Sequence, residues 1–184
     1  MRFFTSFLAA SAALVSVVSA ANYTVQVGLD NGLTYTPPQL MAQPGDMVSF
    51  MFLTKNHTVT QSSFAEPCTS LPGGVDTGFI PVADPNSPTV TAMTMMVNDT
   101  NPIWFYCRQQ GHCMQGMVFA INPTPAQPYE TFQAAAMNTT APMMNMTAAE
   151  TESAPSATEV IVQLVQAAEP WWNAKRSPAL KREI

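Results

Sequence analysis

Short apolar runs separated by turn-forming residues extend from residue 23 to residue 122, and this pattern constrains the fold more than any other feature. The runs are rich in Val, Thr, Phe and Met, and they occupy 23–27, 47–53, 89–97, 103–106 and 117–121. Pro, Gly, Asn and Asp interrupt them at spacings of about ten residues. The pattern is all-β and suits a sandwich or barrel of antiparallel strands in one domain.

The first twenty residues have the features of a secretory signal peptide. Basic Arg2 precedes an apolar stretch, and small Ser19 and Ala20 follow it. The alternative is a membrane anchor, but serines interrupt the apolar run and it is short for a bilayer. We therefore expect 1–20 to be removed, with secretion to the extracellular space and no transmembrane segment.

The composition changes after residue 122. Pro, Ala, Thr, Ser and Met dominate 124–184 without alternation, which predicts a disordered tail after a domain at 21–123. Ser156 and Glu159 form a capping-box pattern ahead of apolar residues, and this indicates a short helix at 156–168. The charged residues at the end of the chain predict that an apolar GPI signal is missing.

The charge balance argues against nucleic acid as a partner. Seven Lys and Arg stand against twelve Asp and Glu, giving a formal net charge of -5. Binding to a phosphate backbone needs a basic face, which this chain lacks.

Five Asn-x-Ser/Thr sequons predict a glycoprotein if the chain is secreted. The asparagines are Asn22, Asn56, Asn98, Asn138 and Asn145. We expect glycans on some of these sites but not on Asn56. A glycan there would crowd the neighbouring His57, which is considered below as a metal ligand.

Three cysteines in an oxidising compartment leave one thiol unpaired after a single disulfide forms. The remaining thiol needs a chemical role or burial. If Cys107 is not that thiol, it forms a bridge with Cys113 or pairs between chains.

Cys107, His112 and Met117 follow one another at five-residue intervals between two strand-like runs. Thiolate, imidazole and thioether are ligands of blue-copper sites, because this set suits both Cu(I) and Cu(II). A second imidazole is needed, and His57 is the only other histidine of the chain. These residues predict a site for one copper ion.

Several segments together resemble a known family. They are the Gly45-Asp46-Met47 turn with the strand after it, His57 to Phe64, Pro67-Cys68, Gly78-Phe79, and the run from Cys107 to Met117. Over residues 23–123 the chain resembles the phytocyanin-like cupredoxins, in particular the secreted fungal members described as extracellular serine-rich proteins.

The resemblance implies a Greek-key β-sandwich with copper bound by His57, Cys107, His112 and Met117. The axial position varies in the family, so Met114 is the second candidate there. The resemblance also implies a disulfide between Cys68 and Cys113. It further implies that electrons pass through a surface-facing His112, near which a redox partner docks.

Two functions follow from these expectations. The first is one-electron transfer or copper binding by a secreted type 1 copper protein. The second is a cell-wall or matrix glycoprotein in which the domain is structural or captures copper without redox turnover. Catalysis is not expected, because two histidines are too few for a trinuclear copper cluster, and a mature chain beginning near Ala21 lacks the N-terminal histidine of copper monooxygenases.

Overall fold

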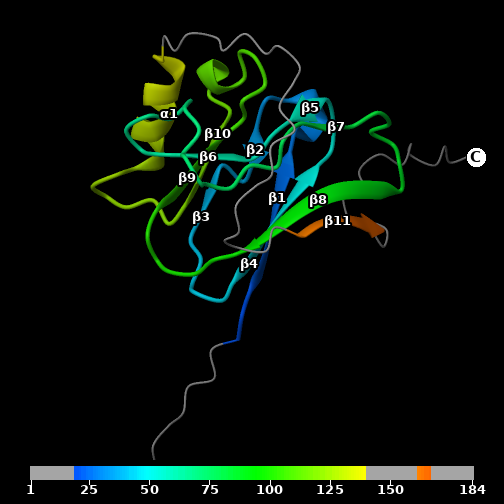
Figure 1. Ribbon diagram of the computed structural model, residues 1–184, viewed down its shortest axis with the longest axis horizontal. Coiled ribbons are helices and arrows are strands. Elements are labelled where there is room, and N and C mark those ends of the chain that lie inside the picture. Colours follow the sequence, from blue (N-terminus) through cyan, green and yellow to red (C-terminus); the bar gives the residue numbers. More distant parts are fainter. Residues whose placement is uncertain (1–18, 140–160, 167–184) are drawn as a thin grey trace, which may run out of the picture.

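Two β-sheets packed face to face form the protein in the computed structural model (Figure 1). The structure describes residues 19–139, and it describes the backbone alone for 161–166. Most of the expected signal peptide, the sequon at Asn145 and the remainder of the tail lie outside these residues. No helix within the described ranges combines the length and apolar character needed to cross a bilayer.

The first sheet has the strand order β11-β8-β4-β1-β2, and the second has the order β3-β10-β9-β6. A separate pair joins β5 to β7. The bounds are β1 Asn22–Val27, β2 Tyr35–Thr36, β3 Gln39–Leu40, β4 Met47–Phe52, β5 Asn56–His57, β6 Thr60–Ser62, β7 Ile80–Pro81, β8 Thr89–Met96, β9 Ile103–Tyr106, β10 Val118–Ile121 and β11 Ile161–Gln166. Short 3-10 helices lie at Leu29–Asn31 (η1) and Cys113–Gln115 (η2), and α1 spans Tyr129–Met137.

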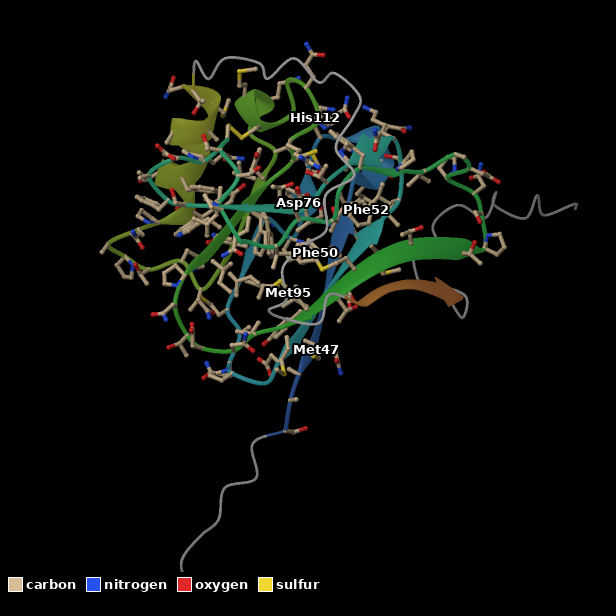
Figure 2. The ribbon with its side chains drawn as sticks, viewed as in Figure 1. Met47, Phe50, Phe52, Asp76, Met95 and His112 are labelled. Carbon is tan, nitrogen blue, oxygen red and sulfur yellow. A yellow bond between two sulfur atoms is a disulfide. The ribbon has the colours of Figure 1, made fainter. Side chains whose placement is uncertain are left out.

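The main core lies between the two sheets and follows from alternation along the strands. In β4, Val48, Phe50 and Phe52 are buried while the residues between them are partly exposed, as expected for a strand with one face on the core. Phe50 packs edge-on against Phe119 of β10 at 5.2 Å between ring centroids. Figure 2 shows Phe50, Phe52 and Met95 in the layer between the sheets. The expected Greek-key β-sandwich is confirmed.

The expectation of antiparallel pairing throughout was wrong at two places. Strand β1 runs parallel to β4, and β3 runs parallel to β10. The chain between β1 and β4 contains β2 and β3, so it is long enough to carry the chain back before β4 begins. The short-run pattern indicates strands, but it does not fix their relative directions.

Helix α1 contradicts the expected boundary at residue 123. Its Tyr129, Phe132 and Ala136 share one helical face and pack on the outer side of β9 and β10, where Trp104 is also buried. The ring centroids of Trp104 and Phe132 lie 4.6 Å apart. The composition of the whole tail hid this short amphipathic segment, so the folded unit extends through α1.

The helix expected at 156–168 was also wrong, since residues 161–166 form strand β11. It pairs antiparallel with β8 along the edge of the first sheet. The segment is rich in Val and Ile, which favour strands. The open edge of β8 supplies the backbone hydrogen bonds, and this tertiary pairing overrides the local capping signal.

Candidate metal centre

The loop between β9 and β10 is closed at its base by the backbone. The N–H of Cys107 donates to the carbonyl of Met117 at 3.1 Å, and the N–H of Met117 donates to the carbonyl of His112 at 3.1 Å. Gly116 ends η2 with a φ of 86°, in the left-handed region that glycine enters most readily. These bonds fold the loop back so that Cys107 and His112 lie close together.

His57 comes from the separate β5–β7 strand pair and lies beside the same loop. It ends β5 and pairs with Ile80 of β7, just after a turn in which Lys55 has a φ of 56°. Its side chain is fully buried. Although it precedes Cys107 by 50 positions, its Nδ1 lies 3.8 Å from the Cys107 sulfur.

The three side chains form one compact donor group at one end of the sandwich. The Nδ1 of His112 lies 3.4 Å from the Cys107 sulfur, and the donor atoms of His57, Cys107 and His112 all lie within 4.8 Å of one another. Cys107 is fully buried whereas His112 is partly exposed. Figure 2 shows His112 at the end of the molecule opposite Met47.

The spacing of the donors fits a small metal ion. Bonds of about 2.0 Å to nitrogen and about 2.3 Å to sulfur, in a trigonal plane, hold the two atoms about 3.7 Å apart. The two observed nitrogen–sulfur distances, 3.8 and 3.4 Å, lie on either side of this value. One thiolate with two imidazoles is the equatorial donor set of blue-copper sites. The residues present therefore fit a copper ion.

The two axial candidates differ in their surroundings. Met117 is fully buried in the same apolar cluster as Cys107. Met114 lies on η2 and is only partly buried. Met117 thus shares the apolar surroundings of Cys107, whereas Met114 does not belong to that cluster.

The surroundings of both imidazoles favour the neutral form, which can bind a metal cation. Burial, followed by the nearby His112 and Lys55, lowers the pKa of His57 to about 4. Burial and then Lys55 also lower the pKa of His112. Both rings are thus neutral near pH 7, with a lone pair available for a metal.

The Cys107 thiol has the opposite tendency without a metal. Burial raises its pKa, and hydrogen bonds from Thr58 and the backbone of Gln109 oppose that rise. A coordinating cation deprotonates such a thiol outright. The buried sulfur is therefore a neutral thiol near pH 7 without a metal, and it would be held as a thiolate in a copper site.

A polar network lies beside the Cys107 sulfur and begins at Thr58, whose N–H donates to that sulfur. It includes Asp76 and Arg108, which the sequence did not single out. The hydroxyl of Thr58 accepts from the N–H of Arg108 at 3.0 Å and shares a 2.8 Å hydrogen bond with the hydroxyl of Thr60. Thr60 donates to Asp76 at 3.0 Å, and Asp76 pairs with the Arg108 guanidinium at 3.2 Å. The position of Arg108 directly after Cys107 was the one available signal; Asp76 had none.

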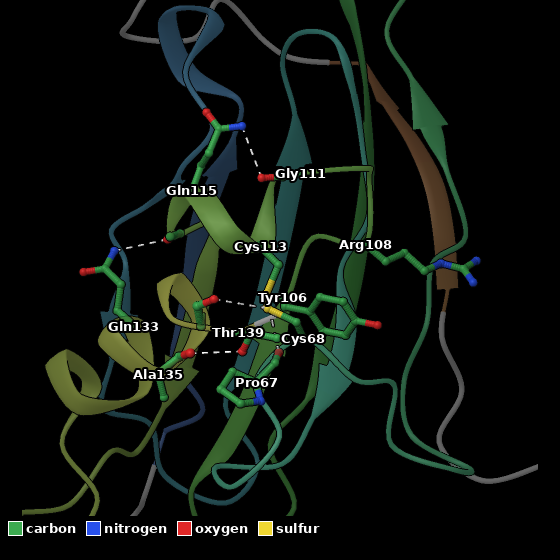
Figure 3. The surroundings of a disulfide bond; sticks show 12 residues. Pro67, Cys68, Tyr106, Arg108, Gly111, Cys113, Gln115, Gln133, Ala135 and Thr139 are labelled. Atoms are coloured by element: carbon green, nitrogen blue, oxygen red, sulfur yellow. Dashed lines mark hydrogen bonds between the residues drawn. A yellow bond between two sulfur atoms is a disulfide. The ribbon is translucent and has the colours of Figure 1, made fainter. Parts of the chain in front are cut away.

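The expected disulfide between Cys68 and Cys113 is present, with Cα atoms 5.8 Å apart (Figure 3). Cys107 is a free, buried cysteine, so the alternative Cys107–Cys113 bridge is excluded. Cys113 follows His112 directly and begins η2. The bridge therefore ties the ligand loop to the segment that precedes β7.

The described sequons fall into two groups. Asn22, Asn98 and Asn138 are exposed, as a glycan would require. Asn56 is partly buried, and its side-chain nitrogen donates to Gln109 at 3.3 Å. The side-chain nitrogen of exposed Asn138 also donates a hydrogen bond, to Ala134 at 2.9 Å, so the two groups differ in burial. The partial burial of Asn56 beside fully buried His57 supports the expectation that Asn56 stays unmodified.

Comparison with known proteins gives two relatives by sequence, and the chain matches no protein-family model. A protein of the fungus Arthroderma benhamiae described as "Probable GPI-anchored cupredoxin-1" is 33% identical over 111 residues, which are 60% of this chain and 56% of the relative. An "Extracellular serine-rich protein" of the same fungus is 29% identical over 119 residues, which are 64% of this chain and 45% of the relative. This chain thus spans about half the length of these relatives, and the expected resemblance to fungal cupredoxins is confirmed.

Solved structures with a similar fold are more distant. Auracyanin A, described as a "blue" copper protein from Chloroflexus aurantiacus, superposes with a TM-score of 0.41 at 11% identity, over 56% of this chain and 98% of auracyanin A. A pseudoazurin from Sinorhizobium gives a TM-score of 0.39 at 21% identity, over 64% and 92% of the two chains. At these scores the site assignment rests on the geometry of this chain.

Proposed function

We propose that this chain is a mononuclear type 1 copper protein that carries single electrons outside the cell. One observation supports this most directly: the donor atoms of His57, Cys107 and His112 lie within 4.8 Å of one another, and Cys107 is the free cysteine. Met117 completes the proposed ligand set. Bound copper supplies a one-electron couple between Cu(I) and Cu(II).

The protein contributes a site whose donors are held before the metal binds. His57 is enclosed by the core, the Thr58 N–H points to the Cys107 sulfur, and the Cys68–Cys113 disulfide anchors the residue after His112. Preorganised donors need little rearrangement when the charge of the site changes. Low rearrangement favours fast electron exchange over substrate chemistry, and we therefore propose no catalytic role.

We place the docking site of the redox partner around the exposed edge of His112. Lys55 and Arg108 are the only Lys or Arg between residues 19 and 139. Lys55 lies close enough to lower the pKa of His57 and His112, while Arg108 follows Cys107 and lies over Phe79 at 5.1 Å. Both cations of an otherwise acidic domain thus lie at the copper end. Because Asp76 pairs with Arg108, the attraction of a partner with an acidic surface rests mainly on Lys55.

We propose an extracellular location, with the signal peptide at 1–20 and glycans on exposed sequons. The names of the two relatives, one GPI-anchored and one extracellular, support this location. Association with the cell wall is part of the same proposal.

Copper titration of the purified protein, followed by optical and electrochemical measurement, tests the function. We expect one Cu(II) per chain, intense visible absorption from thiolate-to-copper charge transfer, and a reversible one-electron wave. Cys107→Ser should abolish the absorption, whereas Cys68→Ser with Cys113→Ser should retain a thiolate and hence the colour if the domain folds.

Two other outcomes would redirect the assignment. Copper binding without a reversible wave would favour the glycoprotein that captures copper. A wild-type protein that keeps a free Cys107 thiol and stays colourless in excess Cu(II) would refute the copper site.

A further inference from the structure

Gly28, which directly follows β1, lies against the imidazole of His57. Its φ is 77°, and a Cβ built on it would stand 2.7 Å from His57 Nε2, 2.9 Å from Thr54 Oγ1 and 3.0 Å from His57 Cδ2. Real Cβ atoms essentially never approach heavy atoms this closely. Any side chain at position 28 would therefore have to displace the ring that presents Nδ1 to the Cys107 sulfur.

The backbone of Gly28 is fixed on both sides, so it cannot move away from the ring. Its N–H donates to the carbonyl of Thr34 at 3.0 Å. Its carbonyl accepts from the hydroxyl of Thr54 at 2.5 Å in a buried hydrogen bond. Thr54 belongs to the turn that leads into His57, and one hydrogen bond thus ties the ligand's own turn to the surface beneath the ring.

His57 is not held by a hydrogen bond from its second nitrogen. Its Nε2 is buried and has no hydrogen-bond partner among the described residues. Metal-binding histidines usually direct this nitrogen to a carboxylate, a carbonyl or water, which fixes the ring. In this chain the contact with Gly28 occupies that side of the ring.

We propose that Gly28 and Thr54 are the positioning residues of His57, and that they set the ring by close packing where other sites use a hydrogen bond. Gly28 provides a surface without a side chain, and Thr54 locks that surface to the turn before His57. The inference rests on the proposed copper site for its purpose, but the packing itself concerns the metal-free protein.

The first test compares Gly28→Ala with Gly73→Ala. Gly73 has a similar φ of 72°, but a Cβ there would meet nothing within 4 Å. Both variants therefore place a side chain at a similar positive φ, and only Gly28→Ala adds the clash with His57 and with the Thr54 hydroxyl. We expect Gly28→Ala to weaken copper affinity by about 10- to 100-fold and to alter the visible spectrum, while Gly73→Ala keeps the wild-type affinity and spectrum.

The second test changes Thr54, in case Gly28→Ala fails to fold. Thr54→Val removes the hydroxyl at nearly constant volume, whereas Thr54→Ser keeps it. We expect Thr54→Val to lower the copper affinity and Thr54→Ser to keep most of the wild-type affinity. Equal affinities in the wild type and both Thr54 variants, or a wild-type spectrum in Gly28→Ala, would overturn the proposal.

A metal-free measurement separates this inference from the proposed function. Long-range 1H–15N NMR spectra report the tautomer and environment of the His57 ring without copper. Gly28→Ala should shift the His57 ring resonances, and Gly73→Ala should leave them in place. A shift in a protein that does not bind copper would uphold the positioning role and reject the copper function, while unchanged ring resonances in Gly28→Ala would reject the positioning role.

Discussion

The backbone N–H of Thr58 donates a hydrogen bond to the sulfur of Cys107 at 3.4 Å, across a sequence separation of 49. The hydroxyl of the same threonine accepts from the N–H of Arg108, the residue after Cys107. One residue thus holds the thiolate position from two directions and couples it to the loop that carries His57.

Replacing Thr58 by Val should loosen the site while preserving the side-chain volume. The backbone N–H to sulfur bond can remain, but the N–H of Arg108 loses its acceptor, so we expect the free energy of unfolding to fall by about 1–3 kcal/mol. The charge-transfer band should also shift. Thr94→Val is the control, because it removes the Ser49–Thr94 hydroxyl bond between β4 and β8 of the first sheet and should leave the band unchanged.

Met117→Gln should lower the reduction potential with copper retained. An oxygen donor favours Cu(II), whereas a thioether favours Cu(I), and the axial ligand tunes the potential. Met114→Gln is the matched control and should leave the potential within error of the wild type. A shift for Met114→Gln alone, measured by protein-film voltammetry, would move the axial assignment to Met114.

Acid should destabilise the metal-free protein through His57. Its pKa falls from 6.5 in the unfolded chain to about 4 in the folded protein, so the unfolded chain binds the proton first as the pH drops. This contribution is fully present above about pH 6.5, is lost between pH 6.5 and 4, and is at most about 3 kcal/mol. The lowered pKa of His112 acts in the same direction.

Chemical denaturation of the metal-free protein between pH 7 and 4 measures this loss. His57→Gln should show a flatter dependence over that range, because the neutral amide does not titrate. An equally steep dependence in the variant would assign the acid sensitivity to other groups.

Truncation should distinguish the folded unit from the tail. Ending the chain after residue 123 removes α1 and exposes the core that Tyr129 and Phe132 cover, at a cost of about 3 kcal/mol or more, since each buried aromatic contributes about 1.5–3 kcal/mol. Ending it after Thr139 keeps α1. We expect the longer form to retain copper affinity and the shorter form to melt at a lower temperature; equal melting temperatures would show that α1 is dispensable.

The sequence alone was enough to indicate the β-sandwich and to suggest His57, Cys107, His112 and Met117 as ligands. Strand alternation and turn residues act locally, and a loop that carries three ligand types at fixed spacing is visible without any fold. The pairing of Cys68 with Cys113 needed the family resemblance, because three cysteines allow several bridges.

Only the tertiary structure decided which neighbours support the site. Asp76 forms an ion pair with Arg108, and Gly28 packs against His57. The partners are far apart in the sequence, so no local sequence pattern predicts these contacts. The same holds for α1 and β11, whose structure depends on the sheet face and the sheet edge available to them. Secondary-structure propensity and residue spacing can be recognised in the sequence itself. Side-chain packing and pairing at a sheet edge form only when distant segments of the chain come together.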